Sequence, residues 1–379
     1  MRSLDKFRGC LVGGAIGDAL GYPVEFMKTS QILAKYGPDG ITRYDRMRGM
    51  ARISDDTQMT LFTATGLLFG QTRGMMRGIG GNGCGFIWNA YLDWFATQSK
   101  FFPLPDDYPK VSWLVNVEDF FHRRAPGTTC MSVLERRNPG SVEEPINEKK
   151  GCGGVMRVAP IGIYFVDNEF WSTDEIDMAG AEAAALTHGH ELGYIPAAAL
   201  VHIVSGLASG RFTEILPAVQ DAMETIKRLF TEAAHMNDFL AIIQRAIDLA
   251  EQDWDDLYAI HELGMGWVAE ETLAISVYCA LKYPNDFEKA MIAAVNHDGD
   301  SDSTGAVTGN ILGAYMGYDA IPEFYKKDLE LHDIILEVAD DLYNDCQMEE
   351  FGDYKDPIWE SKYIDIDYDT EKRKQLRGY

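Results

Sequence analysis

Apolar residues recur along this chain mainly at the spacing of a helix, and few segments alternate between apolar and polar residues as strands do. Residues 4–20 are a clear example. Their apolar face consists of Phe7, Leu11, Ala15 and Ala19. Alanine, leucine, methionine, glutamate and glycine are abundant, whereas alternating runs of β-branched residues are rare. The sequence therefore predicts an all-α protein.

Further helices are predicted wherever the helical spacing returns after a turn signal. They cover residues 54–70, 86–95, 179–186, 196–209, 268–283, 286–296 and 305–316, and a longer amphipathic region covers 213–252. Asn285 with Glu288 is interpreted as the capping pair of the helix over 286–296. Gly309 and Gly313 predict that the last helix packs tightly on a neighbour. Residues 74–85 and 124–151 are expected to be a glycine-rich excursion and a long surface connection.

The sequence contains no internal repeat and no evident domain boundary. We therefore expect one helical domain over residues 1–348, followed by an acidic, aromatic tail over residues 349–379. The tail is expected either to pack on the domain or to bind a partner. Its aromatic residues include Tyr354, Trp359, Tyr363 and Tyr368.

The chain is strongly acidic, with 34 basic and 59 acidic residues and a formal net charge of −25. Such a surface repels a polyanion, so nucleic-acid binding is not expected. It favours divalent cations and a basic protein partner. A small anionic substrate is compatible with this charge if cations and helix N-termini neutralise it locally.

The cysteines indicate a reducing compartment. Six of them are scattered along the chain without a CxxC pair, which is typical of free thiols and not of a disulfide framework or a zinc site. The cytoplasm is therefore the expected location. Uncharged apolar runs are expected to fall far short of the roughly 20 residues that cross a bilayer. Asp5 and Asp18 make the N-terminal segment a poor signal peptide.

Two short acidic clusters, each directly before a predicted helix, carry the main functional signal: Ser54-Asp55-Asp56-Thr57 and residues 298–303, with the sequence Asp-Gly-Asp-Ser-Asp-Ser. Taken alone, the first is more typical of a helix N-cap than of a metal site. In the second, Asp298, Asp300 and Asp302 concentrate negative charge that a cation would relieve. An EF-hand is excluded because Ser303 and Gly309 stand where glycine and glutamate are needed.

If the fold brings the two clusters together, their carboxylate and hydroxyl oxygens suit a pair of Mg²⁺ or Mn²⁺ ions. Asp18 falls on the apolar face of the first helix and therefore needs a partner. Glu25 is a third acidic candidate, although, taken alone, it is more typical of a solvated loop residue. Residues 151–154, Gly-Cys-Gly-Gly, form either a plain turn or a cradle for a diphosphate. His188 and His297 have structural interpretations beside functional ones.

These segments together resemble the ADP-ribosylglycohydrolase family. The resemblance lies in five blocks in family order, which are residues 9–21 with Glu25, residues 54–59, residues 151–162, Thr187-His188, and residues 298–305 followed by 309–314. Ser54, Ser301 and Ser303 stand where threonine is common, and these changes keep the hydroxyl. Cys152 stands where asparagine is common, which removes a polar group from the substrate loop.

The resemblance implies a compact orthogonal helical bundle with two Mg²⁺ or Mn²⁺ ions. The implied metal ligands are Ser54, Asp55, Asp56, Asp300, Asp302 and Ser303. The implied catalytic residues are Glu25, on a mobile flap, with Asp55, Asp56 and Asp302. The implied substrate-binding residues are Gly151, Cys152, Gly153, Gly154 and His188.

The implied activity is hydrolysis of the glycosidic bond that joins ADP-ribose to a protein side chain, with arginine as the expected linkage. A second interpretation is an immunity or antidote protein that binds a basic ADP-ribosyltransferase, with or without catalysis. A third, a metal-dependent phosphatase or pyrophosphatase, accounts for the carboxylates but not for the glycine loop.

Overall fold

The computed structural model describes residues 2–78, 84–168 and 170–378, and within these ranges it contains only helices, turns and three isolated bridges. This confirms the prediction of an all-α fold. The α-helices are α1 (Leu4–Gly21), α2 (Thr29–Tyr36), α3 (Asp55–Met75), α4 (Cys84–Ser99), α5 (Thr128–Arg136), α6 (Ala159–Tyr164), α7 (Thr173–Ala185), α8 (Glu191–Ser209), α9 (Ile215–Leu229), α10 (Met236–Ala250), α11 (Asp256–Leu263), α12 (Ala269–Lys282), α13 (Phe287–Val295), α14 (Ser301–Met316), α15 (Glu323–Lys326), α16 (His332–Asn344), α17 (Pro357–Tyr363) and α18 (Thr370–Arg377). Short 3₁₀ turns are η1 (Tyr22–Val24), η2 (Trp113–Asn116), η3 (Glu118–Phe120) and η4 (Cys152–Gly154).

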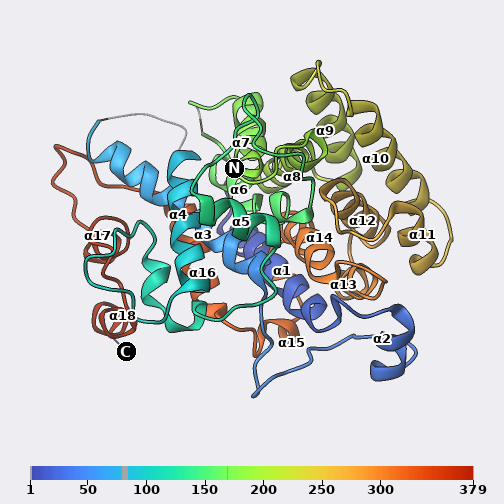
Figure 1. Ribbon diagram of the computed structural model, residues 1–379, viewed down its shortest axis with the longest axis horizontal. Coiled ribbons are helices and arrows are strands. Elements are labelled where there is room, and N and C mark those ends of the chain that lie inside the picture. Colours follow the sequence, from blue (N-terminus) through green and yellow to red (C-terminus); the bar gives the residue numbers. More distant parts are fainter. Residues whose placement is uncertain (1, 79–83, 169, 379) are drawn as a thin grey trace.

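An antiparallel pair of helices, α1 and α14, lies near the middle of the molecule (Figure 1). Both helices carry glycine at every fourth position along the shared face. A Cβ on Gly13 or Gly17 would overlap the backbone of α14, and one on Gly309 would overlap the backbone of α1. The two backbones are therefore in direct contact, as the spacing of Gly309 and Gly313 predicted.

This close contact positions the functional groups. Because the helices are antiparallel, the C-terminal end of α1 meets the N-terminal end of α14, and Gly21 lies against the backbone of Ser301. Asp18 near the end of α1 is thereby brought to the same place as the acidic loop before α14. The N-terminus of α3 joins them through hydrogen bonds to Asp18.

Helix α8 corrects two expectations. The sequence predicts a start at Pro196, but the helix begins five residues earlier at Glu191, where His190 Nδ1 accepts a hydrogen bond from Leu192 N at 3.0 Å. The helix is also 19 residues long and apolar enough to span a membrane by length and composition, so the expectation of much shorter apolar runs was wrong. Since 89% of its apolar window is buried inside the protein, it is a core helix.

Other local predictions also differ from the structure. The connection over residues 124–151 contains α5, and α3 continues past residue 70 to Met75. The amphipathic region 213–252 is divided into α9 and α10. Asp286, not Asn285, caps α13, because its carboxylate accepts from Lys289 N at 3.0 Å. The predicted excursion at 74–85 lies partly outside the described residues.

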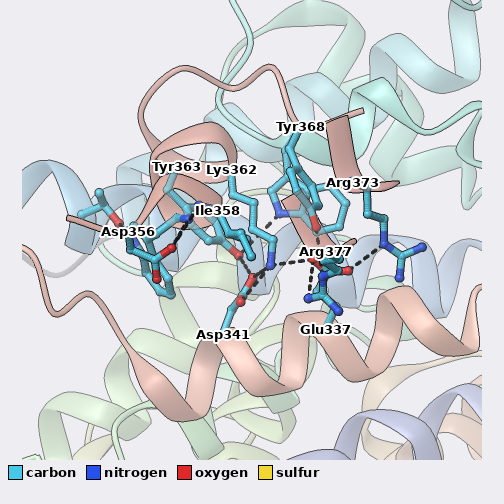
Figure 2. Close-up of polar contacts among 12 residues, drawn as sticks. Glu337, Asp341, Asp356, Ile358, Lys362, Tyr363, Tyr368, Arg373 and Arg377 are labelled. Carbon is cyan, nitrogen blue, oxygen red and sulfur yellow. Dashed lines mark hydrogen bonds and ion pairs between the residues drawn. The ribbon is translucent and has the colours of Figure 1, made fainter. Parts of the chain in front are cut away.

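The C-terminal tail packs on the body of the protein at the edge opposite α9, α10 and α11 (Figure 1). Trp359 Nε1 donates to Thr72 Oγ1 of α3 at 2.9 Å. Figure 2 shows Lys362 of α17 between Asp341 and Glu337 of α16, with Arg377 of α18 reaching the same glutamate. Of the tail aromatics named above, only Tyr354 is exposed. The other three are therefore not available to bind a partner.

Candidate metal centre and substrate cavity

Asp18 organises the N-terminus of α3. Its carboxylate is fully buried and accepts hydrogen bonds from Ser54 N at 2.9 Å and from Thr57 N at 3.0 Å. The Thr57 hydroxyl also donates to it. These donors are unpaired amides of a helix start, so the carboxylate stabilises α3 through its backbone. The sequence predicts that Asp18 needs a partner, and in the structure that partner is the backbone of the first acidic cluster.

Asp55 forms hydrogen bonds with two residues, Arg124 and Gly127, that were not identified from the sequence. Its N–H donates to Arg124 O at 3.2 Å, and its Oδ2 accepts from Gly127 N at 3.1 Å. Arg124 is buried and forms a bidentate pair with Glu330 at 3.1 and 3.2 Å. Glu330 also accepts from Ile53 N at 3.1 Å. No local sequence signal links these segments, because their contact depends on the packing of distant loops.

The two acidic clusters meet directly. Ser303 Oγ donates to Asp56 Oδ2 at 2.8 Å, across 247 residues of sequence. Asp300 caps α14 by accepting from Ser303 N at 3.4 Å, and Asp302 accepts from the same N–H at 3.0 Å. Ser54 is the N-cap of α3. The cap interpretation and the interpretation as one oxygen-rich site are therefore both compatible with the structure.

Glu25 completes this cluster. One carboxylate oxygen from each of Glu25, Asp300 and Asp302 lies within 4.8 Å of the others. All three side chains are buried, and Glu25 Oε2 has no hydrogen-bond partner. Three buried carboxylates at this separation repel one another strongly. A hard divalent cation would relieve that repulsion and bind the unpartnered oxygen, so the donor set fits such an ion.

The protonation of these groups reflects their crowding. Burial, with the nearby charge of Asp302, raises the pKa of Asp18 to about 7 and that of Glu25 to about 11. The same two causes raise the pKa values of Asp55 and Asp56. Without a cation the cluster therefore holds protons near neutral pH, and binding of a cation would release them.

The cluster forms one wall of a cavity of about 360 Å³, which is within the size range of small-molecule sites. The glycine turn η4 lies on another side. Cys152 N donates to Trp267 O at 3.2 Å, which joins this turn to the segment before α12. At the rim Phe26 stacks on Trp267 with ring centroids 5.7 Å apart and planes 20° apart. Phe26 is 73% exposed.

His188 lies beneath the glycine turn as a neutral, buried base. Burial, with the positive charge of Arg157, lowers the pKa of His188 to about 3. Its Nδ1 is hydrogen-bonded to Thr187 Oγ1 at 2.8 Å, and Arg157 donates to the same hydroxyl at 2.8 Å. Arg157 is fully buried, and its guanidinium lies 4.2 Å from the centre of the Tyr91 ring.

Most of the residues predicted for the site line this one cavity. They are Glu25, Asp55, Asp56, Gly151, Cys152, Gly153, His188, Asp300, Asp302 and Ser303. Ser54 and Gly154 do not line it. Ser54 Oγ accepts from Asp56 N at 3.2 Å, and a Cβ on Gly154 would lie 2.9 Å from Gly193 O, so both pack beneath the site.

Of the structural and functional interpretations of His297, the structure supports the structural one. Its Nε2 is hydrogen-bonded to Ala294 O at 3.0 Å and to Thr304 Oγ1 at 2.9 Å, and the side chain is fully buried. Trp267 and Phe26, which form the rim, were not identified from the sequence. Gly264 and Gly266 are the sequence signal that could have drawn attention to Trp267, because two closely spaced glycines indicate a turn directly before it. Both glycines have positive φ in the structure.

Comparison with known proteins agrees with this fold and site. Residues 1–351 match the ADP-ribosylglycohydrolase family. The chain is 24% identical to mouse ADP-ribosylhydrolase ARH3 over 355 residues, 87% of this chain and 88% of that protein. It is 24% identical to the ADP-ribosyl-[dinitrogen reductase] glycohydrolase of Rhodospirillum rubrum over 335 residues, 86% of this chain and 91% of that protein.

The solved structure of an ADP-ribosylglycohydrolase-related protein complex has the same fold, with a TM-score of 0.59 and 22% identity. The match covers 90% of this chain and 98% of that one. The chain therefore belongs to the ADP-ribosylglycohydrolase family, and the resemblance found in the sequence is confirmed. It is a glycohydrolase of a metal-dependent family, and Glu25, Asp300 and Asp302 form the candidate place for an ion.

Proposed function

We propose that this protein hydrolyses the bond between ADP-ribose and a modified protein side chain, using two Mg²⁺ or Mn²⁺ ions. The observation that carries the proposal is the hydrogen bond between Ser303 and Asp56, because it joins both acidic clusters into one oxygen-rich wall. We assign Asp55 and Asp56 to one face of the metal centre and Asp300, Asp302 and Ser303 to the other. These oxygen donors suit Mg²⁺ or Mn²⁺ better than zinc.

When bound, the two ions would orient the ribose hydroxyls and lower the pKa of a water molecule. Water attack at C1 of the ribose requires a base for the water proton and an acid for the leaving nitrogen. Glu25, Asp55, Asp56 and Asp302 are the candidates, because their carboxylates line the cavity.

The remaining walls of the cavity suit the other parts of ADP-ribose. The Gly151–Gly153 turn is the candidate contact for the diphosphate through the backbone N–H groups of Gly151 and Gly153, since that of Cys152 donates to Trp267 O. His188, which is neutral, offers its second ring nitrogen toward the Gly151 turn. The stacked rings of Phe26 and Trp267 would contact a planar group at the rim.

We further propose an arginine linkage. The proposal of this linkage rests on the family resemblance, and the bacterial relative acts, by its name, on ADP-ribosyl dinitrogen reductase. The direct test is incubation of the protein and Mg²⁺ with arginine-, serine- and O-acetyl-linked ADP-ribose. Release of ADP-ribose only from the arginine conjugate supports the proposal. Release only from another conjugate rejects the linkage, and release from none rejects the hydrolase.

A further inference from the structure

Asp298 belongs to the second acidic cluster, but it does not line the cavity. Its Oδ1 instead accepts a hydrogen bond from the backbone N–H of Thr29, the first residue of α2. Its Oδ2 lies 3.9 Å from Nε2 of His261. The Asp298 side chain is 35% exposed, so its replacement would not leave a hole in the core. This acidic residue therefore connects the metal-binding loop to a different segment of the chain.

That segment is the one that carries Glu25. Glu25 follows η1, and only Phe26, Met27 and Lys28 separate it from Thr29. Between these points the chain is held by the stack of Phe26 on Trp267 and by Met27 N, which donates to Val24 O at 2.8 Å. The bond from Thr29 to Asp298 secures the far end of the segment.

The position of Glu25 depends on how its segment is held, because its own side chain is incompletely hydrogen-bonded. Its carboxylate lies within 4.8 Å of oxygens of Asp300 and Asp302, and one of its own oxygens has no hydrogen-bond partner. An oxygen without a hydrogen-bond partner does not fix the side chain in place, so the backbone on either side of Glu25 must do so. A connection from the loop of Asp300 and Asp302 back to the Glu25 segment supports that backbone.

We propose that Asp298 is a positioning residue, which holds Glu25 over the metal centre by fixing the N-terminus of α2 to the loop that carries Asp300 and Asp302. One short loop then sets both the metal ligands and the distance to Glu25. This inference rests on the proposed function for its effect on catalysis, whereas its structural part can be measured without a substrate.

The test uses two replacements with a matched control. Asp298→Ala removes the acceptor for Thr29 N. Asp298→Asn keeps an oxygen that can accept the same bond, since asparagine and aspartate are comparable caps. Asp369→Ala is the control, because Asp369 accepts from Lys372 N at 2.8 Å at the start of α18. This is another eight-residue helix, and it lies on the opposite side of the molecule from α2 (Figure 1).

Hydrogen exchange of residues 25–36 and steady-state kinetics on ADP-ribosylated protein with Mg²⁺ are then compared. We expect Asp298→Ala to speed exchange in this segment and to lower kcat about tenfold or more, as a misplaced catalytic group does, with a smaller change in KM. Asp298→Asn should resemble the parent protein in both measurements. Asp369→Ala should leave exchange at 25–36 and kcat unchanged.

Two results would overturn the inference. One is exchange in Asp298→Ala equal to that of the control. The other is an Asp298→Asn protein as impaired as Asp298→Ala, because the negative charge, and not the hydrogen bond to Thr29, would then be the important property. If the parent protein releases no ADP-ribose, the proposed function fails while the exchange measurement still decides the role of Asp298.

Discussion

The hydroxyl of Ser303 donates a hydrogen bond to Oδ2 of Asp56 at 2.8 Å, and this bond joins the N-termini of α14 and α3. We expect Ser303→Ala to weaken Mg²⁺ or Mn²⁺ binding by about 10-fold to 100-fold, as the loss of a group that orients metal ligands does. Ser303→Thr keeps the hydroxyl and should bind nearly as the parent. Calorimetric titration with Mn²⁺ measures both; equal affinities in all three proteins would remove Ser303 from the site.

Asp302 is the carboxylate whose charge raises the pKa values of most of its neighbours. Asp302→Asn should lower kcat by at least about 100-fold, because a ligand and candidate acid–base group is lost. It should also raise the melting temperature of the metal-free protein, since one repelling charge is removed. The exposed Asp107→Asn variant is the control. Retained activity in Asp302→Asn would exclude Asp302 from catalysis.

The contact between α1 and α14 leaves no room for a methyl group. Gly309→Ala should cost at least about 2 kcal/mol of unfolding free energy, because its Cβ would overlap the carbonyl group of Gly13. Gly85→Ala is the matched control, as a Cβ there meets nothing within 4 Å and alanine is the better helix former. Urea unfolding compares them. Equal stabilities would contradict the direct backbone contact.

The buried carboxylates predict that the metal-free protein loses stability as the pH rises. The pKa values of Glu25 and Asp18, about 11 and about 7 in the folded state, are lower in the unfolded chain. The folded state therefore binds more protons, and stability falls with rising pH by about 1.4–2 kcal/mol per pH unit between roughly pH 7 and pH 8.5. The pKa values of His188 and His297 are lowered to about 3 and about 4 in the folded protein and are about 6.5 in the unfolded chain, so above pH 7 both are mostly neutral in both states.

This pH dependence is measured by calorimetric melting in a chelator and in excess Mg²⁺. Because cations bind the deprotonated carboxylates, the stabilisation by Mg²⁺ should grow with pH. A melting temperature that rises with pH in the chelator would show that these carboxylates are not strained in the folded protein.

The tail should be part of the folded unit, although residues 352–379 lie outside the family match. Lys362 is 1% exposed and pairs with Glu337 at 2.8 Å and Asp341 at 2.7 Å. Lys362→Met should cost about 3–5 kcal/mol, because it leaves the buried carboxylate of Asp341 without its cation, whereas Glu337 keeps Arg373 and Arg377. Lys374→Met, which breaks an exposed pair with Glu371, should cost at most about 1 kcal/mol. A similar loss of unfolding free energy in the two variants would contradict the role of buried Lys362 in attaching the tail.

Much of the local structure could be predicted from the sequence, because helix periodicity and caps depend on neighbouring residues. The start of α3 at Asp55 and the extent of α1 agree with the prediction to within one residue. The short helix α5 was missed because its nine residues, Thr128–Arg136, are too few to display a clear period. Asp286 was passed over for Asn285 because both are good caps and differ by a single position.

From the sequence, the candidate site could be predicted only as a set of residues with oxygen atoms that could bind a metal ion. Oxygen chemistry is a property of the residues themselves, so Asp55, Asp56, Asp300 and Asp302 were identifiable in the linear sequence. Three other features were not identifiable, because each is a contact between distant segments. They are the hydrogen bonds of Asp18 to the start of α3, the bond of Asp55 to Arg124, and the bond of Asp298 to Thr29. The position of Asp18 beside the acidic clusters follows from the glycine faces that bring α1 and α14 together. The contacts of Arg124 and Asp298 follow from the packing of distant loops, and no local pattern indicates where these segments meet.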